Sequence, residues 1–264
     1  MIWLPAYAAT GALVGFLAGL LGIGGGMTLV PVLAAMFAAQ SFAPDHSVHL
    51  ALGTAMASIV FTSSASVREH HRHGAVDWQI VKRMVPGMLL GALISTVATG
   101  WIAQRTLALA FAVIVYAGAT QILIGRKPAA HATMPGAPVV FGVGTIIGVI
   151  SGLVSAGGTF LTVPFMLYCG LRMHTAIGTG AAIGIPVAII GTVGYIISGW
   201  HVAALPSWSI GFIYLPALAL LVAGSIVTAP MGARYAHKLP VNTLRRVFAC
   251  LLYVLATKMV VTYW

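Results

Sequence analysis

Long runs of apolar residues, separated by short polar stretches, follow one another from one end of the chain to the other. They cover residues 6–38, 48–67, 84–104, 106–124, 138–168, 174–198, 208–229 and 244–262. About 20 consecutive apolar residues are enough for a helix to cross the hydrocarbon core of a bilayer. All runs except the first and the fifth have this length, so the pattern predicts an all-α polytopic membrane protein.

The first and fifth runs are too long for one crossing and too short for two, and glycines interrupt both of them. Residues 19–31 read GLLGIGGGMTLVP, and residues 152–164 read GLVSAGGTFLTVP. Backbone that is not helical is tolerated at membrane depth only where protein or a cavity surrounds it. Each of the two runs is therefore predicted to form a glycine-broken helix or a re-entrant helical hairpin.

The two glycine runs belong to an internal repeat, whose matched landmarks come in the same order in both copies. These landmarks are 19–31 with 152–164, 49–58 (HLALGTAMAS) with 174–183 (HTAIGTGAAI), Gly74 with Gly199, and Gly91 with Gly224. A Pro- and Gly-rich polar stretch between the copies is typical of a linker. The predicted organisation is a first transmembrane repeat over 1–126, a linker over 127–136 and a second transmembrane repeat over 137–264.

Composition supports the membrane interpretation. Hydrophobic residues make up 60% of the chain and charged residues only 6%, whereas an average soluble domain has roughly 25% charged residues. The net charge of +10 would suit a nucleic-acid partner if the protein were soluble. The basic residues lie almost entirely between the apolar runs, however. We therefore expect them to orient the chain in the lipid bilayer, and we expect no nucleic-acid partner.

The basic residues also decide how the first and fifth runs cross. If every run crosses once, the basic residues of the loops divide evenly between the two faces. If these two runs return to the side they entered, all 13 Lys and Arg residues except Arg105 and Lys258 share one face, as the positive-inside rule expects for the cytoplasmic side. A returning hairpin plus three crossings carries the chain to the opposite face, so the two repeats are predicted to be inverted. The basic loops 68–83, 126–127 and 234–246 are then cytoplasmic.

Inverted repeats with interrupted helices at matched positions are typical of secondary transporters, whose binding site lies where the repeats meet. The N–H groups and positive dipole at a helix start bind anions, and glycine lets the backbone approach closely. Asp45, Glu69 and Asp77 all fall between the apolar runs, so the sequence lacks the intramembrane carboxylate that a buried cation needs.

We therefore expect a small-anion site at the two glycine elements. Its predicted residues are Gly24, Gly25, Gly26 and Thr28 in the first half, and Gly157, Gly158 and Thr159 in the second. The alternative interpretation is that these glycines only allow close packing of helices, as small residues do in membranes.

Two histidines, His49 and His174, occupy the same position of the repeat. Such a residue could contact the anion or carry a coupling proton near neutral pH, or it could be an interfacial residue at a helix start, and the sequence leaves both roles open. The run 69–73 (EHHRH) resembles a metal cluster only superficially, because no spaced partner ligands accompany it, so we expect a solvated loop and no metal. No HExxH or GxSxG motif occurs, and we expect neither an enzyme nor a cofactor.

Both halves contain motifs that together resemble those of a known family. The first half has GxGGGxxxVP (22–31), ALGT (51–54) and HxRHGxVDW (70–78), and the second has SGLVSAGGTFLTVP (151–164), AIGT (176–179) and GYIISG (194–199). In these motifs, and over nearly its whole length, the chain resembles the sulfite exporter TauE/SafE family. The resemblance implies a multi-pass permease of the bacterial cytoplasmic (inner) membrane for sulfite, a sulfonate or a related small organic anion. It also implies that Gly53, Thr54, Gly178 and Thr179 belong to the substrate region.

The expected function is therefore secondary transport of a small anion, in the direction of export, by alternating access of the two repeats around a central site. Two alternatives stay open at this point: a passive anion channel, and a membrane sulfur-transfer protein that uses Cys169. The expected partners are the small anionic substrate, the lipid bilayer and a coupling proton. The sequence leaves the oligomeric state undecided.

Overall fold

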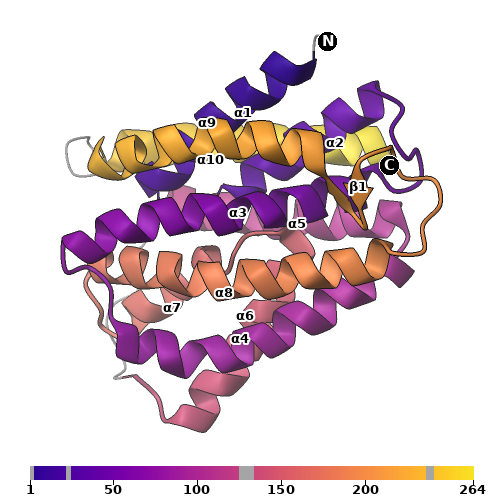
Figure 1. The fold of residues 1–264 in the computed structure, drawn as a ribbon. Helices are drawn as coiled ribbons and strands as arrows, with labels where there is room; N and C mark the ends of the chain where they lie inside the picture. Colours follow the sequence, from indigo (N-terminus) through magenta and orange to yellow (C-terminus); the bar gives the residue numbers. More distant parts are fainter. Residues whose placement is uncertain (1–2, 22–24, 125–133, 236–240) are drawn as a thin grey trace.

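The computed structural model describes residues 3–21, 25–124, 134–235 and 241–264, which are almost entirely helical (Figure 1). The first half contains α1 (Trp3–Leu21), α2 (Gly26–Ala39), α3 (Ser47–Arg72), α4 (Trp78–Ala98), the short 3-10 helix η1 (Thr99–Trp101) and α5 (Gln104–Ile124). The second half contains α6 (Ala137–Val154), α7 (Thr159–Tyr168), α8 (Met173–Gly199), β1 (Ser209–Ile210), β2 (Ile213–Tyr214), α9 (Leu215–Tyr235) and α10 (Val241–Tyr263). Gly24 and most of the predicted linker, 127–133, lie outside the described residues.

Seven of the described helices, α1, α3, α4, α5, α6, α8 and α9, are long and apolar enough to cross a membrane. α2, α7 and residues 248–263 of α10 form shorter apolar helices. Exposed tryptophans lie at or just beyond element ends, where an aromatic belt meets the membrane surface; they include Trp101, Trp200, Trp208 and Trp264. The prediction of a polytopic helical membrane protein is confirmed.

Both glycine runs interrupt their helices, as predicted. The first break separates α1 from α2, and the second separates α6 from α7. The end of α2 folds back to the start of α1, where the side-chain amide of Gln40 donates to the Tyr7 hydroxyl at 2.6 Å. The first run therefore forms a helical hairpin, and Gly25 at its turn is buried.

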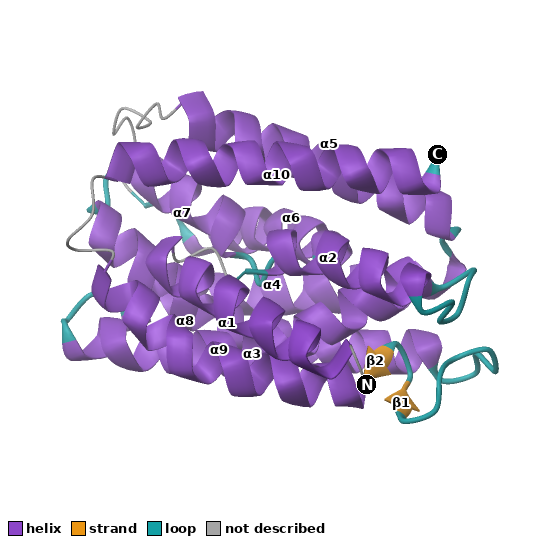
Figure 2. Cartoon of the chain, turned by 90° about the horizontal axis from the view of Figure 1, so that it is seen from above, coloured by secondary structure: helices purple, strands orange, loops and turns teal. Residues whose placement is uncertain are grey.

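The long helices run side by side, and their connections gather at two opposite ends of the molecule (Figure 2). At one end the last turns of α3 and α9 meet, and the Arg234 guanidinium approaches the Glu69 carboxylate at 3.6 Å. We call this the basic end, after Arg68, Arg72, Arg172 and Arg234. The other, which we call the β end, contains β1 and β2, and the backbone N–H of Tyr214 there donates to the Thr54 hydroxyl of α3 at 3.0 Å.

Each half packs its helices against those of the other half. α1 of the first half lies along α9 of the second, and α4 of the first lies along α6 of the second. The matched glycines serve these two contacts: a Cβ at Gly91 would lie 2.0 Å from the Thr145 carbonyl oxygen of α6, and one at Gly224 would lie 2.5 Å from the Ala8 carbonyl oxygen of α1. Such close backbone approach drives helix association in lipid, where no hydrophobic force acts between helices.

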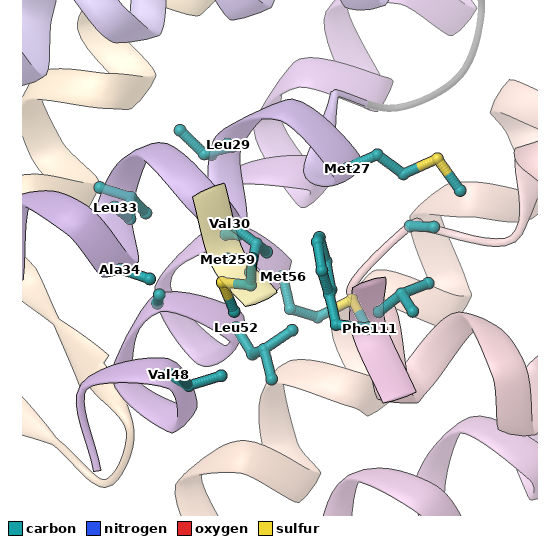
Figure 3. Close-up of a cluster of buried hydrophobic side chains, with 14 of the residues drawn as sticks. Met27, Leu29, Val30, Leu33, Ala34, Val48, Leu52, Met56, Phe111 and Met259 are labelled. Atoms are coloured by element: carbon teal, nitrogen blue, oxygen red, sulfur yellow. The ribbon is translucent and has the colours of Figure 1, made fainter. Parts of the chain in front are cut away.

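α3 is the central helix of the bundle. Of its membrane-spanning stretch 78% is buried, against 28% for α9, and it contacts α2, α8 and α9. Figure 3 shows part of the apolar cluster that surrounds it, with Val30, Leu52, Met56, Phe111 and Met259 brought together from α2, α3, α5 and α10. Most of the polar side chains in the spanning part of α3 are therefore surrounded by protein atoms.

Two elements depart from the predicted pattern, and the first is the end of α3. The apolar run is predicted to end at residue 67, but α3 continues to Arg72, so Glu69 lies in its last turn and not in a loop. Its carboxylate lies 3.9 Å from the Arg72 guanidinium and 3.6 Å from that of Arg234. The helix can continue past the apolar run because these cations balance the only carboxylate that it carries.

The second departure is at the start of α9. The run 208–229 is predicted to be one helix, but residues 209–214 form a β-hairpin that turns at Gly211, whose φ is +53°. A Cβ at Gly211 would lie 2.4 Å from the Ile196 carbonyl oxygen, and the Phe212 N–H donates to the Tyr195 carbonyl at 3.2 Å. The hairpin backbone thus packs directly on α8, which ends the helical pattern there.

Candidate functional site

The two glycine turns have the same backbone geometry. Gly25 (φ 72°, ψ −13°) and Gly158 (φ 84°, ψ −26°) are matched positions, and each takes the left-handed conformation immediately before its helix, α2 or α7. This conformation costs a residue with a Cβ about 1–2 kcal/mol, and glycine avoids that cost. The left-handed backbone at these two turns is therefore a sufficient reason for glycine at both positions.

The two turns lie against each other inside the bundle. A Cβ at Gly26 would lie 1.7 Å from the carbonyl oxygen of Ser155, so the start of α2 touches the turn before α7. The Ser155 hydroxyl donates to the Leu52 carbonyl of α3 at 2.8 Å. A Cβ at Gly157 would lie 3.0 Å from Ile59, which is near the middle of α3. The predicted glycine elements of the two halves thus meet halfway along the central helix.

Gly184 of α8 is a further central residue, which the motifs do not indicate. A Cβ there would lie 3.1 Å from the Gly157 carbonyl oxygen, 3.4 Å from the Ser63 hydroxyl and 3.7 Å from the Thr159 hydroxyl. Polar groups from α3, α7 and the second glycine turn therefore face one point of α8. The signal in the sequence is its spacing of four from Gly180, a small-residue pattern typical of close helix contacts in membranes.

Two helix starts meet at this centre. The first backbone hydrogen bonds of α2 and α7 are donated by Thr28 to Gly25 at 3.2 Å and by Leu161 to Gly158 at 3.3 Å. Earlier N–H groups of a helix have no acceptor within it; here they are those of Gly26, Met27, Thr159 and Phe160. These groups and the positive ends of two helix dipoles favour a negative charge.

The hydroxyls beside the helix starts already donate to backbone carbonyls. Thr28 donates to Gly25 at 2.8 Å, Thr159 donates to Gly180 at 3.4 Å, and Thr162 donates to Gly158. Since the protons of these three hydroxyls are in use, the donors that α2 and α7 offer to an anion are the N–H groups of their helix starts.

The two Gly-Thr pairs lie away from this centre and anchor connections. Thr54 accepts the N–H of Tyr214 at 3.0 Å, and Thr179 accepts the N–H of Asp77 at 2.9 Å. A Cβ at Gly53 would lie 2.1 Å from the Phe212 carbonyl oxygen, and one at Gly178 would lie 2.2 Å from that of Ala75. Each pair therefore holds the segment that leads into α9 or α4, one toward the β end and the other toward the basic end.

The matched histidines occupy different environments. His49 is 2% exposed, and its Nε2 lies 3.0 Å from the carbonyl oxygens of Thr99 and Ile102. Because a carbonyl only accepts, Nε2 carries the hydrogen, and Nδ1 is buried without a hydrogen-bond partner among the described residues. The His46 ring lies 5.4 Å away, centroid to centroid. His174 is exposed at the start of α8, so the structure does not bring the two histidines together.

The remaining candidates lie outside the centre. In the described part of the chain no three His, Cys, Asp or Glu residues are placed to hold a metal ion. Cys169 follows the last residue of α7 and is buried, and this burial raises the pKa of its thiol above the ordinary value. Its thiol is therefore protonated at neutral pH, which makes it a poor nucleophile.

A groove of about 310 Å³ opens on the outer surface between α3, α8 and the β-hairpin. Its walls are apolar except for Thr192, whose hydroxyl donates to the Ala188 carbonyl of its own helix at 2.6 Å. Such walls suit lipid chains and offer an anion no donor, so the groove is not part of the candidate site.

The matches to known proteins cover nearly the whole chain. The family model described as sulfite exporter TauE/SafE matches residues 7–259. A probable membrane transporter protein of Haemophilus influenzae is 37% identical over 94% of this chain and 95% of its own length. The probable membrane transporter protein YdhB of Bacillus subtilis is 24% identical over 88% of this chain and 90% of its own. No solved structure matches. The extent of the family match and the identity to the first of these relatives place the chain in the sulfite exporter TauE/SafE family of membrane transporters.

Proposed function

We propose that the chain moves a small anion across the membrane by alternating access, with its binding site between the two glycine turns. The observation that carries the proposal is the meeting of the α2 and α7 helix starts beside Ile59, halfway along α3. Helix starts supply N–H donors and positive dipole ends, which bind an oxyanion without any charged side chain. Membership of a transporter family makes transport the reaction class to test first.

The substrate that we propose is sulfite, a sulfonate or a related small oxyanion. The family is described as a sulfite exporter family, and the donors at the glycine turns are N–H groups. The three acidic residues lie far from these turns along their elements: Asp45 precedes α3, Glu69 is in its last turn, and Asp77 caps α4. A buried cation would call for a carboxylate at the site, so the arrangement favours an anion.

We propose further that the halves are inverted copies that move about this site. The matched packing supports this, because α1 lies on α9 as α6 lies on α4, and α3 lies on α9 as α8 lies on α4. The contact of Gly26 with the Ser155 carbonyl leaves no room for a methyl group, so we propose that the two turns separate when the anion enters between them. The basic end is proposed to face the cytoplasm of a bacterial cell, by the positive-inside rule.

A sulfur-transfer role for Cys169 has less support. Its thiol is buried and protonated, and the ten residues of α7 separate it from the glycine turn. At 1.5 Å per residue this is about 15 Å, too far for the thiol to attack a group bound at the helix starts.

The test is transport of radiolabelled sulfite by purified protein in liposomes. A transporter saturates with sulfite concentration and exchanges internal for external substrate, whereas a channel passes current in proportion to the driving force. Gly25→Val and Gly158→Val should each abolish transport while the protein still inserts, because valine cannot take the left-handed backbone at the turns. Gly142→Ala is the control, since a Cβ at Gly142 has no heavy atom within 4 Å. Undiminished sulfite transport by both valine variants would refute a site at the glycine turns.

A further inference from the structure

Three polar side chains form a buried stripe on the face of α3 that meets α8. Ser63, Ser66 and His70 are spaced three and four residues apart, which places them on one face of the helix, and they are 4%, 5% and 7% exposed. Ser63 lies beside Gly184, and a Cβ at Gly178 would lie 3.2 Å from the Cβ of His70. The stripe therefore runs from the meeting point of the glycine turns toward the basic end. We call it the Ser66 stripe.

The Ser66 hydroxyl has no hydrogen-bond partner among the described residues, although it is buried. Neighbouring hydroxyls of α3 do not share this state: Ser58 donates to the Ala55 carbonyl at 2.8 Å, Thr62 to Ser58 at 2.9 Å and Ser64 to Val60 at 2.6 Å. A buried hydroxyl without a partner calls for an explanation. A ligand that passes the hydroxyl and accepts its hydrogen bond is such an explanation.

The matched positions of the second half carry no such stripe. The repeat aligns Ser63, Ser66 and His70 of α3 with Ala188, Gly191 and Tyr195 of α8. A Cβ at Gly191 would lie 2.7 Å from the Met56 methyl carbon, and the Tyr195 hydroxyl donates to the Gly152 carbonyl at 2.8 Å. Among the described residues, the matched positions of α8 therefore hold no buried hydroxyl without a partner, whereas α3 holds one at Ser66.

Electrostatics at the outer end of the Ser66 stripe favour the same ligand. Arg72 lies two residues after His70, and Arg234 of α9 approaches Glu69 in the same turn of α3. These cations outnumber the single carboxylate, so the mouth of the route attracts anions.

We propose that the Ser66 stripe is the polar half-path by which a small oxyanion passes between the central site and the basic end. Ser63 and Ser66 donate hydroxyl hydrogen bonds to the anion. The imidazole of His70 contacts the anion at the end of the stripe that lies toward the basic end. The inference rests on the proposed anion transport and adds to it the residues of one half of the route. The ligand class is a sulfite- or sulfonate-like oxyanion, which accepts several hydrogen bonds and offers none when fully ionised.

The experiment uses single cysteines in the full chain after Cys169→Ser and Cys250→Ser. Ser66→Cys is treated in membrane vesicles with a methanethiosulfonate reagent that carries a sulfonate, added on the basic side. Two controls are Ser64→Cys, two residues away on an exposed face, and Ala188→Cys, the matched position of Ser63. Ser66→Cys should react at least tenfold faster than either control, and ethanesulfonate should slow its reaction.

Reaction of Ser66→Cys no faster than that of Ser64→Cys would overturn the half-path, even if sulfite transport is saturable. Fast, protected labelling in a protein that shows no saturable sulfite transport would support the half-path and refute the proposed function. Ser66→Ala provides a second measurement that needs no thiol chemistry. It should lower sulfite transport at least fivefold relative to Ser64→Ala, and equal rates for the two variants would also overturn the half-path.

Discussion

Thr54 and Thr179, which share one position of the repeat, each accept a backbone N–H from the segment that leads into another helix. The donor is Tyr214, next to α9, for Thr54 and Asp77, next to α4, for Thr179. Both hydroxyls are fully buried. In both halves, a threonine at the same repeat position thus holds the segment that leads into a helix, and the two threonines do so at opposite ends of the molecule.

Thr54→Val and Thr179→Val should each destabilise the protein, because each leaves a partly buried N–H without an acceptor. The expected loss is about 1–3 kcal/mol of unfolding free energy, measured as a lower midpoint of thermal unfolding in detergent. Thr145→Val is the control, since it removes only a bond to Phe141 in its own helix. A normal unfolding midpoint with a raised KM for sulfite would contradict the anchoring role and return these residues to the substrate region.

Gly184→Ala should reduce transport more than it reduces stability. The added methyl would lie 3.1 Å from the Gly157 carbonyl oxygen and 3.4 Å from the Ser63 hydroxyl, which is the space that the proposed anion shares. We expect at least a tenfold loss in sulfite transport by variants that insert normally. Gly142→Ala, which adds a methyl in open space, should transport at the parental rate. Parental transport by Gly184→Ala would place the substrate elsewhere.

His49→Gln separates the two roles that the sequence leaves open. Glutamine keeps an N–H donor for the Thr99 carbonyl but has no ring nitrogen that can take up a proton. If the buried Nδ1 accepts the coupling proton, the dependence of sulfite transport on pH between about 5 and 8 becomes flatter in this variant. His174→Gln, at an exposed position, should leave the pH profile unchanged. An unchanged profile for His49→Gln as well would assign His49 to the tie between α3 and η1.

Cys169→Ser should leave sulfite transport intact, since the thiol lies a full helix away from the glycine turn. Burial raises the pKa of the Cys169 thiol, so at a given pH a smaller fraction is thiolate than for an ordinary cysteine, whose pKa is about 8.5. Iodoacetamide should therefore modify Cys169 more slowly than a solvent-exposed cysteine at pH 7.5, and the difference should shrink as the pH rises. Loss of transport in Cys169→Ser would revive the sulfur-transfer alternative.

The helix breaks could be predicted because their cause is local. Three glycines occur in succession near residue 25, and two near residue 157. Such glycines indicate a backbone conformation that other residues avoid and that a regular helix does not use. The membrane-spanning helices follow equally from the length of the apolar runs. The β-hairpin at 209–214 is missed because its apolar residues, Ile210 and Ile213, continue the apolar run that leads into α9.

The positions of Gly184 and Ser66 depend on how α3 and α8 are rotated against each other, which no single stretch of sequence determines. In the sequence, Ser66 cannot be told apart from the other hydroxyl residues of α3. It differs only in the structure, where Ser58, Thr62 and Ser64 donate hydrogen bonds and Ser66 does not donate to any described residue. The anchoring role of Thr54 has the same origin, because its partner Tyr214 is distant in the chain. Contacts between the halves thus decide what each motif does.

The exchange of helices between the halves constrains how the protein is made. α1 is synthesised well before α9, the helix that it packs on, because α2 to α8 lie between them in the chain. Until then the small-residue face of α1, with Gly11 and Gly15, has only lipid or the insertion machinery beside it. A nascent chain that stops before Leu215 leaves this face without α9. The contact between α1 and α9 can therefore form only after α2 to α8 have been made.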